Sequence, residues 1–270
     1  MTVDMHRPQG TRRASAPRSP ILTYHGITPW EADPGPRNPK YDVHPERFRD
    51  QLTHIRARGY EAMSLSAWWS GSGRRPVVLT FDDGWASMYE RAWPLLADAG
   101  LHADCFVNTA TIGSRGFLTW AQITEMQRHG MTFHSHSHEH VALSGLALGE
   151  LERQVGDSKR LLEDRLGTAV QFLAAPYGLV NRRVVKAALA QGYHAICTSW
   201  NWLARPGART INRAAVYRDT SLEEFDRLLR GSLVAYGPRV AREMVVHLPR
   251  LILLRAHVLN LNVFQEEHAP

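Results

Sequence analysis

The stretch over residues 78–85 constrains the fold more than any other part of the sequence. An apolar and β-branched run ends in two adjacent carboxylates, Asp82 and Asp83, followed by Gly84. Such a run predicts a buried strand that delivers two acids to its carboxyl end. Neighbouring side chains of an extended chain point to opposite faces, so one acid can hold a metal ion while the other accepts a proton. An Asp–Gly turn that only closes the strand is the alternative.

Strand-like and helix-like segments alternate along most of the chain, and a glycine follows most of the helix-like ones. The predicted strands cover residues 21–26, 60–64, 78–81, 103–108, 131–133, 170–174 and 194–198. The predicted helices cover residues 45–59, 88–99, 119–129, 150–166, 181–191 and 221–235. This order predicts an α/β fold with a mostly parallel sheet, in which chemistry gathers where strands end. Periodicity alone does not separate an open sheet from a barrel.

The two ends of the chain differ in composition from the middle. Residues 1–19 are rich in Arg, Pro and Ser and contain no apolar stretch of the signal-peptide kind, which predicts a disordered basic tail and a cytoplasmic location. Residues 20–236 are expected to form the catalytic domain. The extension over residues 237–270 is apolar and basic, but its uncharged runs are too short to span a bilayer. We expect a packed helix there; peripheral contact with the inner membrane or with a biosynthetic complex is the alternative.

Charge and cysteine content exclude several classes of protein. The formal net charge is +6, and 29 of the 32 basic residues are arginine. These arginines are scattered and do not form a stripe with aromatic residues, so we expect no nucleic-acid partner. The two cysteines, Cys105 and Cys197, stand in apolar surroundings without metal-ligand spacing, which predicts buried thiols and excludes a disulfide framework.

Four histidines lie between residues 134 and 140, directly after a predicted strand. Two pairs have the i, i+4 spacing that lets two imidazoles reach one ion: His134 with His138, and His136 with His140. The spacing does not choose between them. Either pair, combined with Asp83, gives two histidines and one carboxylate, which leaves metal positions open for water and substrate. Asp82 would then deprotonate the metal-bound water.

Several of these segments resemble the motifs of one enzyme family in order and spacing. Residues 80–84, Thr-Phe-Asp-Asp-Gly, resemble the first motif of polysaccharide deacetylases, the NodB-homology domains of carbohydrate esterase family four. His-Ser-x-x-His resembles the second motif, and residues 174–178, Ala-Ala-Pro-Tyr-Gly, resemble the third. The opening Leu-Thr-Tyr-His over residues 22–25 is similar to the first strand of exopolysaccharide-type members. The resemblance covers residues 20–230.

The resemblance implies a distorted (β/α) barrel that removes acetyl groups from amino sugars of a glycan with a divalent metal ion, most commonly zinc. It places Asp82 as the catalytic base and Asp83 as a metal ligand. The family's spacing from the preceding glycine, Gly130, favours His136 and His140 as the other two ligands. An acetylated glycan is then the expected partner.

The third motif implies the substrate groove. Pro176, Tyr177 and Gly178 would line this groove, and the backbone N–H of Tyr177 would donate to the oxyanion. Trp85, directly after the first motif, is also expected to contact the glycan.

Two departures from the family pattern bear on activity. The arginine that orients the base in the third motif is Ala174 here, so Arg182, Arg183 or Arg218 would have to replace it. The family's late Leu-x-His, which supplies the general acid, has no match, and His25 is our preferred substitute. A related hydrolase of other amides or O-acetyl esters is the runner-up function. A glycan-binding protein without turnover, favoured by Ala174, is the rival from another class.

Overall fold

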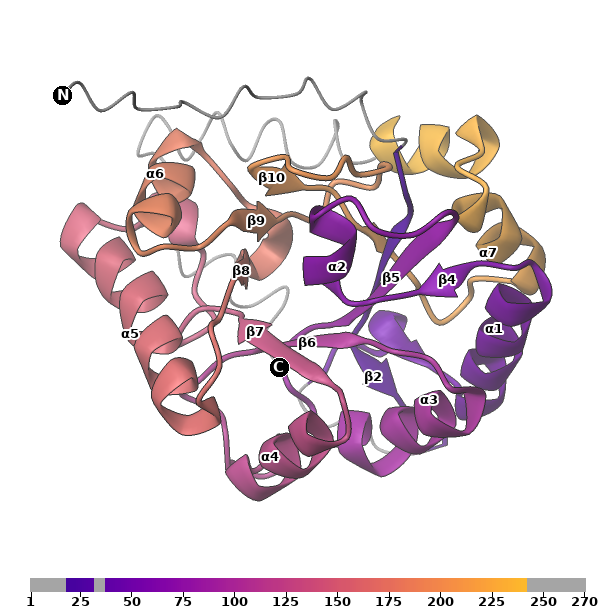
Figure 1. Cartoon of the computed structure of the whole chain (residues 1–270), viewed down its shortest axis with the longest axis horizontal. Helices are drawn as coiled ribbons and strands as arrows, with labels where there is room; N and C mark the ends of the chain where they lie inside the picture. The colour runs from indigo at the N-terminus through magenta and orange to yellow at the C-terminus, as the bar shows by residue number, and fades with distance from the viewer. Residues whose placement is uncertain (1–17, 32–36, 242–270) are drawn as a thin grey trace, which may run out of the picture.

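A computed structural model describes residues 18–31 and 37–241, and within them a nine-stranded parallel sheet carries the fold (Figure 1). Its strand order is β10-β9-β8-β7-β6-β5-β1-β11, with β4 pairing beside β5. The strands are β1 (Ile21–Tyr24), β4 (Glu61–Ala62), β5 (Pro76–Phe81), β6 (Asp104–Val107), β7 (Thr132–Ser135), β8 (Phe172–Ala174), β9 (Ala195–Cys197), β10 (Thr210–Ile211) and β11 (Ala214–Ala215). Because the strands are parallel, their carboxyl ends all lie at the same end of the sheet.

The two outermost strands of the sheet, β10 and β11, are connected through one short segment. β10 pairs with β9 and β11 pairs with β1, and only Asn212 and Arg213 separate β10 from β11. The chain therefore leaves one edge of the curled sheet and joins the other within two residues, which brings the two edges together in a distorted barrel. The barrel expected from the sequence is confirmed, and Arg213 stands at the crossover.

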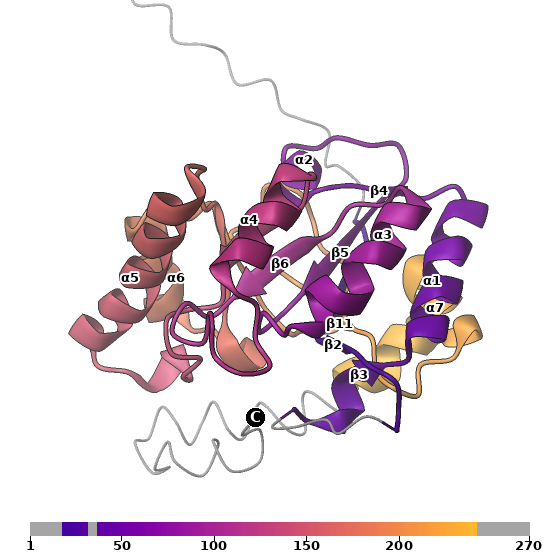
Figure 2. The same ribbon diagram turned by 90° about the horizontal axis from the view of Figure 1, so that it is seen from below.

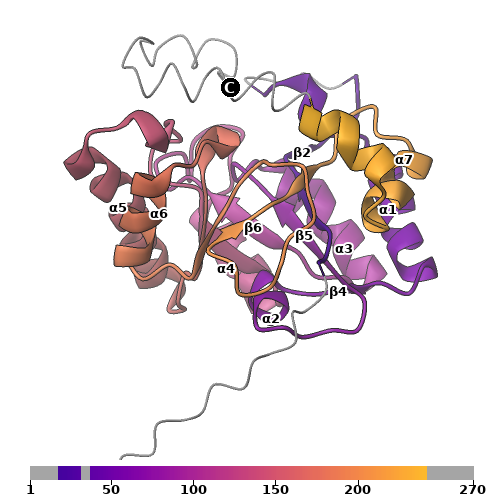
Figure 3. The ribbon, with the colours of Figure 1, turned by 90° about the horizontal axis from the view of Figure 1, so that it is seen from above.

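Helices surround the outside of the barrel (Figure 1). They are α1 (Pro45–Ala57), α3 (Trp93–Ala99), α4 (Trp120–Arg128), α5 (Leu148–Leu166), α6 (Arg182–Ala190) and α7 (Leu222–Leu229). Helix α5 packs beside α6, and α1 packs beside α7 (Figures 1 and 3). Side-chain caps fix several starts, because Thr119, Asn181 and Ser221 accept hydrogen bonds from the first free backbone N–H groups.

The structure corrects three of the expected elements. The helix expected over residues 88–99 is a π-helical turn, Met88–Ala92, followed by α3, because Pro94 has no N–H for a regular α-helical bond. Helix α7 ends at Leu229 rather than near residue 235, since Gly231 adopts a left-handed φ of 69°. The strand expected over residues 60–64 is reduced to the two residues of β4.

Some short elements carry too little pattern to be expected from the sequence. The five-residue helix α2 (Leu65–Trp69) lies at the opposite end of the barrel from the short pair β2 (Gly26–Ile27) and β3 (Asp42–Val43), as Figures 2 and 3 show. The backbone N–H of Leu65 donates to Oδ2 of buried Asp104 at 2.9 Å, which ties α2 to the start of β6.

Apolar side chains fill the barrel below the strand ends. Ile21, Val78, Phe106 and Phe172 form one buried cluster with Trp68 of α2. A larger cluster packs between the sheet and the outer helices. Below the strand ends the interior is mostly apolar, with buried Asp104 and His134 as polar exceptions.

The structure describes little of the two ends of the chain. The expected tail, except residues 18 and 19, and most of the C-terminal extension lie outside the described residues. Between residues 18 and 241, leaving out 32–36, no helix combines the length and apolarity needed to cross a bilayer.

Candidate active site

Asp83 leaves strand β5 through two consecutive left-handed residues. Asp83 has a φ of 71° and Gly84 a φ of 76°. Glycine suits the second position, because a Cβ there would lie 3.0 Å from Cγ1 of Val107 on the neighbouring strand. This tight turn brings the Asp83 carboxylate toward the end of β7, where the histidines lie.

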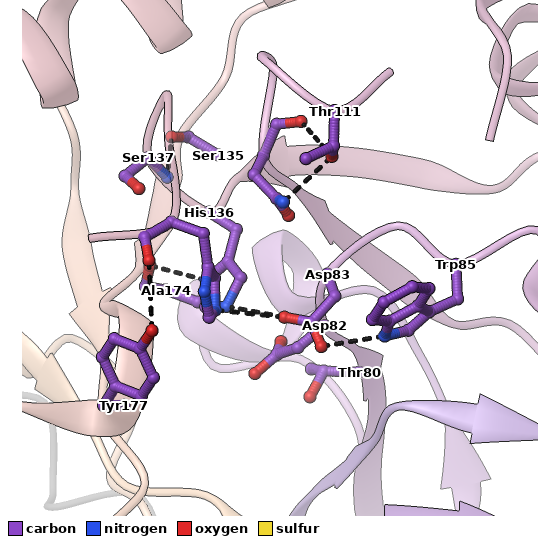
Figure 4. Close-up of polar contacts among 12 residues, drawn as sticks. Thr80, Asp82, Asp83, Trp85, Thr111, Ser135, His136, Ser137, Ala174 and Tyr177 are labelled. Carbon is purple, nitrogen blue, oxygen red and sulfur yellow. Dashed lines mark hydrogen bonds and ion pairs between the residues drawn. The ribbon is translucent and has the colours of Figure 1, made fainter. Parts of the chain in front are cut away.

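Three side chains at the strand ends converge as a candidate metal centre (Figure 4). Oδ1 of Asp83 lies 3.3 Å from Nε2 of His136 and 3.3 Å from Nε2 of His140. The three ligand atoms lie within 4.8 Å of one another. One carboxylate oxygen and two imidazole nitrogens are a donor set suited to a divalent ion such as zinc, so the residues present fit the metal that the sequence implies.

The other histidine pair, His134 and His138, contacts residues outside the Asp83 cluster. His134 points into the barrel, where its Nε2 lies 3.3 Å from Oδ1 of Asp104. Nδ1 of His138 is hydrogen-bonded to Oγ1 of Thr109 at 2.7 Å. Neither side chain is part of the Asp83 cluster, so of the two pairs that spacing left open only His136 and His140 lie beside Asp83.

The His136 ring is held by the backbone at the position that lacks the expected arginine. Its Nδ1 is hydrogen-bonded to the carbonyl oxygen of Ala174 at 2.9 Å. A carbonyl only accepts, so Nδ1 carries the proton and Nε2 is left to face Asp83. Burial acts to lower the pKa of His136, but the carboxylates of Asp82 and Asp83 outweigh it, and the pKa is raised.

Asp82 is bound by Arg213, from the crossover between β10 and β11. Nη1 of Arg213 donates to Oδ1 and Nη2 donates to Oδ2, each at 2.7 Å. Nε of Arg213 donates to the carbonyl oxygen of Thr198, so the guanidinium is held from both ends. Burial acts to raise the pKa of Asp82, but the Arg213 charge and hydrogen bonds, with the nearby histidines, hold it below its usual value.

The expectation that Arg182, Arg183 or Arg218 replaces the missing arginine is therefore wrong, because Arg213 contacts Asp82. None of the three makes the contact: Arg182 and Arg183 lie at the start of α6, where Arg183 bonds to the carbonyl oxygen of Leu146, and Arg218 follows β11. The role of Arg213 is hard to predict from the sequence, because the strands on either side of it have only two residues each.

Trp85 lies against the Asp83 carboxylate. Its indole Nε1 donates to Oδ2 of Asp83 at 2.9 Å (Figure 4). The indole stacks on Phe117 with ring centroids 4.2 Å apart and is 4% exposed. So little exposed surface offers almost nothing for a sugar ring to stack on, in contrast to the glycan contact expected from the sequence.

His25 occupies the end of β1, beside the two carboxylates. Its Nδ1 is buried and has no hydrogen-bond partner in the described part of the chain. The ring packs on Tyr41 with centroids 4.5 Å apart. Burial lowers the pKa of His25, although the carboxylates of Asp83 and Asp82 act in the opposite direction.

The segment Pro176–Gly178 forms one turn of 3-10 helix beside His140. Tyr177 adopts a φ of 59°, and its ring centroid lies 5.0 Å from that of His140. Gly178 has a φ of 68°, and a Cβ there would lie 2.5 Å from Cβ of Ser199. The expected groove residues therefore adjoin the candidate metal centre, and no larger residue fits at Gly178.

A parallel α/β barrel with two histidines, one carboxylate and a second, arginine-bound carboxylate at its strand ends is typical of hydrolases that use a divalent metal ion. Residues 70–196 match the family model described as polysaccharide deacetylase. This match assigns residues 70–196 to a polysaccharide deacetylase domain, which confirms the motif-based prediction.

Curated relatives agree with this family. The chain is 29% identical over 180 residues to a Bacillus subtilis protein named as a polysaccharide deacetylase, covering 64% of this chain and 62% of that one. It is 28% identical over 171 residues to a poly-β-1,6-N-acetyl-D-glucosamine N-deacetylase of Staphylococcus epidermidis, covering 56% of this chain and 59% of that one. The match spans about three fifths of the length of these relatives.

Solved structures share the fold over most of the described chain. The Streptococcus pyogenes deacetylase PplD, solved with acetate, superposes with a TM-score of 0.73 and 26% identity over 80% of this chain and 99% of that one. IcaB from Ammonifex degensii superposes with a TM-score of 0.69 and 22% identity over 79% of this chain and 97% of that one, which supports the fold.

Proposed function

We propose that this protein is a metal-dependent N-deacetylase that hydrolyses acetyl groups from the N-acetylated amino sugars of a polysaccharide or lipid-linked oligosaccharide. The observation that carries the proposal is the pairing of two different carboxylates at one strand end. Asp83 faces two histidines, and Asp82 faces an arginine. The N-deacetylase named among the relatives supports this substrate class.

The proposed metal ligands are Asp83, His136 and His140. A divalent ion bound there, proposed as Zn²⁺, would act as a Lewis acid toward the acetyl carbonyl oxygen. The protein contributes the orientation of these donors: Ala174 fixes the ring of His136, and Tyr177 packs against that of His140.

Asp82 would accept the proton of the attacking water as general base. Its lowered pKa keeps it ionised at neutral pH, so it is ready to take a proton. Arg213 occupies both carboxylate oxygens and so fixes the plane of the base. In this proposal Arg213 performs the orienting task that the family assigns to the arginine absent at Ala174.

The remaining tasks fall to His25 and Tyr177. The backbone N–H of Tyr177 would donate to the oxyanion that forms on the acetyl group. His25 would give a proton to the leaving amine. Because its pKa is lowered, His25 is neutral at neutral pH and would receive that proton from Asp82 during turnover. Pro176 and Gly178 would line the groove beside these groups.

Acetate release from N-acetylglucosamine oligomers tests the proposal, with zinc-loaded wild type compared with Asp82→Asn. Release that collapses in the variant, with zinc binding retained, supports the reaction and the base together. An O-acetylated glycan assayed in parallel separates amide from ester hydrolysis. If wild type binds the glycan and zinc but releases acetate from neither substrate, the enzymatic proposal is wrong, and the glycan-binding alternative replaces it.

A cytoplasmic location and a contact between residues 237–270 and a membrane or a biosynthetic complex stay predictions. Co-sedimentation with anionic liposomes before and after deletion of residues 242–270 tests the contact. Unchanged co-sedimentation would contradict it.

A further inference from the structure

We propose that Trp85 is a positioning residue for the metal ligand Asp83: its indole N–H holds one carboxylate oxygen so that the other alone faces the two histidines. The inference rests on the metal site of the proposed function. It concerns how strongly this chain's own residues bind the ion, rather than which reaction follows.

The two oxygens of the Asp83 carboxylate have separate partners. Oδ2 accepts from Nε1 of Trp85 at 2.9 Å, and Oδ1 lies 3.3 Å from each histidine Nε2 (Figure 4). An indole N–H can only donate and a carboxylate can only accept, so the direction of this bond is fixed. Because the acceptor is charged, the bond belongs to the stronger, charge-assisted kind.

The indole itself is fixed from several sides. One partner is Phe117, on which it stacks with an interplanar angle of 23°, and another is Arg37, whose guanidinium carbon lies 5.2 Å from the ring centroid. Arg37 is in turn hydrogen-bonded to Asp42 through Nε at 3.1 Å. A ring held in this way has little freedom to turn its N–H away from Asp83.

The backbone on either side of Trp85 is fixed as well. Trp85 and Phe117 form an isolated antiparallel bridge. The N–H of Ala86 donates to the carbonyl oxygen of Gly116, and the N–H of Leu118 donates to that of Gly84, each at 2.8 Å. This pairing sets the position of the indole relative to the left-handed turn at Asp83.

This arrangement reduces the conformational freedom of the ligand. The two oxygens of the ionised Asp83 carboxylate are chemically equivalent, so their hydrogen-bond partners decide which oxygen faces the histidines. Without the indole, the carboxylate could rotate away from the histidines or offer both oxygens to the ion. Partners of this kind, which orient a metal ligand, typically change metal affinity about 10- to 100-fold.

Zinc affinity of the chelator-treated protein tests the inference without relying on turnover. Zn²⁺ is titrated against a chromophoric chelator for wild type and Trp85→Phe, which keeps an aromatic ring and removes the N–H. We expect the dissociation constant of Trp85→Phe to rise about 10- to 100-fold. A Co²⁺-loaded sample adds a spectroscopic readout, because freeing Oδ2 changes the ligand field and shifts the visible absorption bands.

The chain offers a matched control in Trp68. This tryptophan is fully buried in the barrel, and its indole N–H has no partner among the described residues. Trp68→Phe therefore removes the same atoms from a packed site without removing a hydrogen bond. We expect it to cost stability but to leave zinc affinity and the Co²⁺ spectrum unchanged.

The outcomes separate the inference from the metal site on which it rests. If wild type binds no zinc, both fail. If wild type binds zinc and Trp85→Phe binds equally well or more tightly, the positioning role alone is wrong. An equal loss in both variants would also overturn it, because generic packing would then explain the effect. If Trp85→Phe does not fold, benzothienylalanine at position 85 keeps the indole shape without the N–H, and the same weakening is expected.

Discussion

The guanidinium of Arg213 and the carboxylate of Asp82 face each other through two parallel hydrogen bonds of 2.7 Å, although both side chains are almost fully buried. Arg213 stands where the chain passes from one edge of the sheet to the other, and Asp82 follows the central strand β5. The ion pair therefore links the closure of the barrel to the proposed base, and a change at either residue should affect both stability and catalysis.

The two members of this pair should not contribute independently to the stability of the protein. Arg213→Gln leaves Asp82 buried without a counter-charge, a change that typically costs about 3–5 kcal/mol in the free energy of unfolding. The double variant Arg213→Gln, Asp82→Asn leaves no charge behind and should lose less than the two single losses added together. Urea unfolding of the four proteins measures this coupling. Additive losses would show that the pair does not act as a unit.

Arg213 should also be needed to orient the base. Arg213→Lys keeps the positive charge but cannot make two parallel bonds, so we expect kcat to fall about 10²-fold while zinc affinity is unchanged. Acetate release and zinc titration on the same samples separate the two effects. Full activity in Arg213→Lys would mean that charge alone suffices and that the bidentate geometry has no catalytic role.

The pKa of Asp82 predicts how stability depends on pH. Because its folded-state pKa lies below the unfolded value of about 3.9, ionised Asp82 stabilises the metal-free protein above that pH. This contribution should be lost as pH falls through the folded-state pKa. Wild type should therefore exceed Asp82→Asn in unfolding free energy at pH 7, and the gap should narrow below pH ~4. Chemical unfolding of metal-free samples at both pH values tests this, and a constant gap would contradict it.

The clustering of Asp83 with two histidines beside Asp82 could be predicted from sequence because each of these residues lies within a short segment at the end of a strand. Spacing alone left His134 and His138 as alternatives, since the i, i+4 pattern does not say which rings face Asp83. Arg213 could not be found this way. Strands of two residues show no periodicity, and their pairing with β9 and β1 depends on the closed sheet.

Trp85 shows a second limit of the sequence. An aromatic residue beside a glycan site suggests sugar stacking, but whether its ring is exposed depends on distant packing. Here Phe117 and Arg37 pack on the ring. The same tertiary dependence explains why α2 was not expected: its five residues are tied to Asp104 of a different element.

His25 should matter for turnover but not for metal binding. His25→Gln keeps a polar side chain of similar size and removes the titrating group, so we expect kcat to fall about 10²-fold with unchanged zinc affinity. His194→Gln, which alters a ring stacked on Trp69 away from the cluster, is the control and should keep full kcat. Turnover by His25→Gln at the wild-type rate would remove His25 as the acid.

Gly178 should tolerate no side chain, because its neighbour Ser199 occupies the space that a Cβ would need. A Cβ at position 178 would lie 2.6 Å from the backbone nitrogen of Ser199, so Gly178→Ala must move the turn that carries Tyr177. Gly113→Ala is a matched control, since Gly113 also has a positive φ of 87° but nothing within 4 Å of the added Cβ.

We expect the control to lose about 1 kcal/mol of unfolding free energy from its backbone conformation alone. Gly178→Ala should lose more and should also release acetate more slowly, because the N–H of Tyr177 moves with the turn. Equal stability losses in the two variants, with full activity in Gly178→Ala, would show that the Ser199 contact does not position Tyr177.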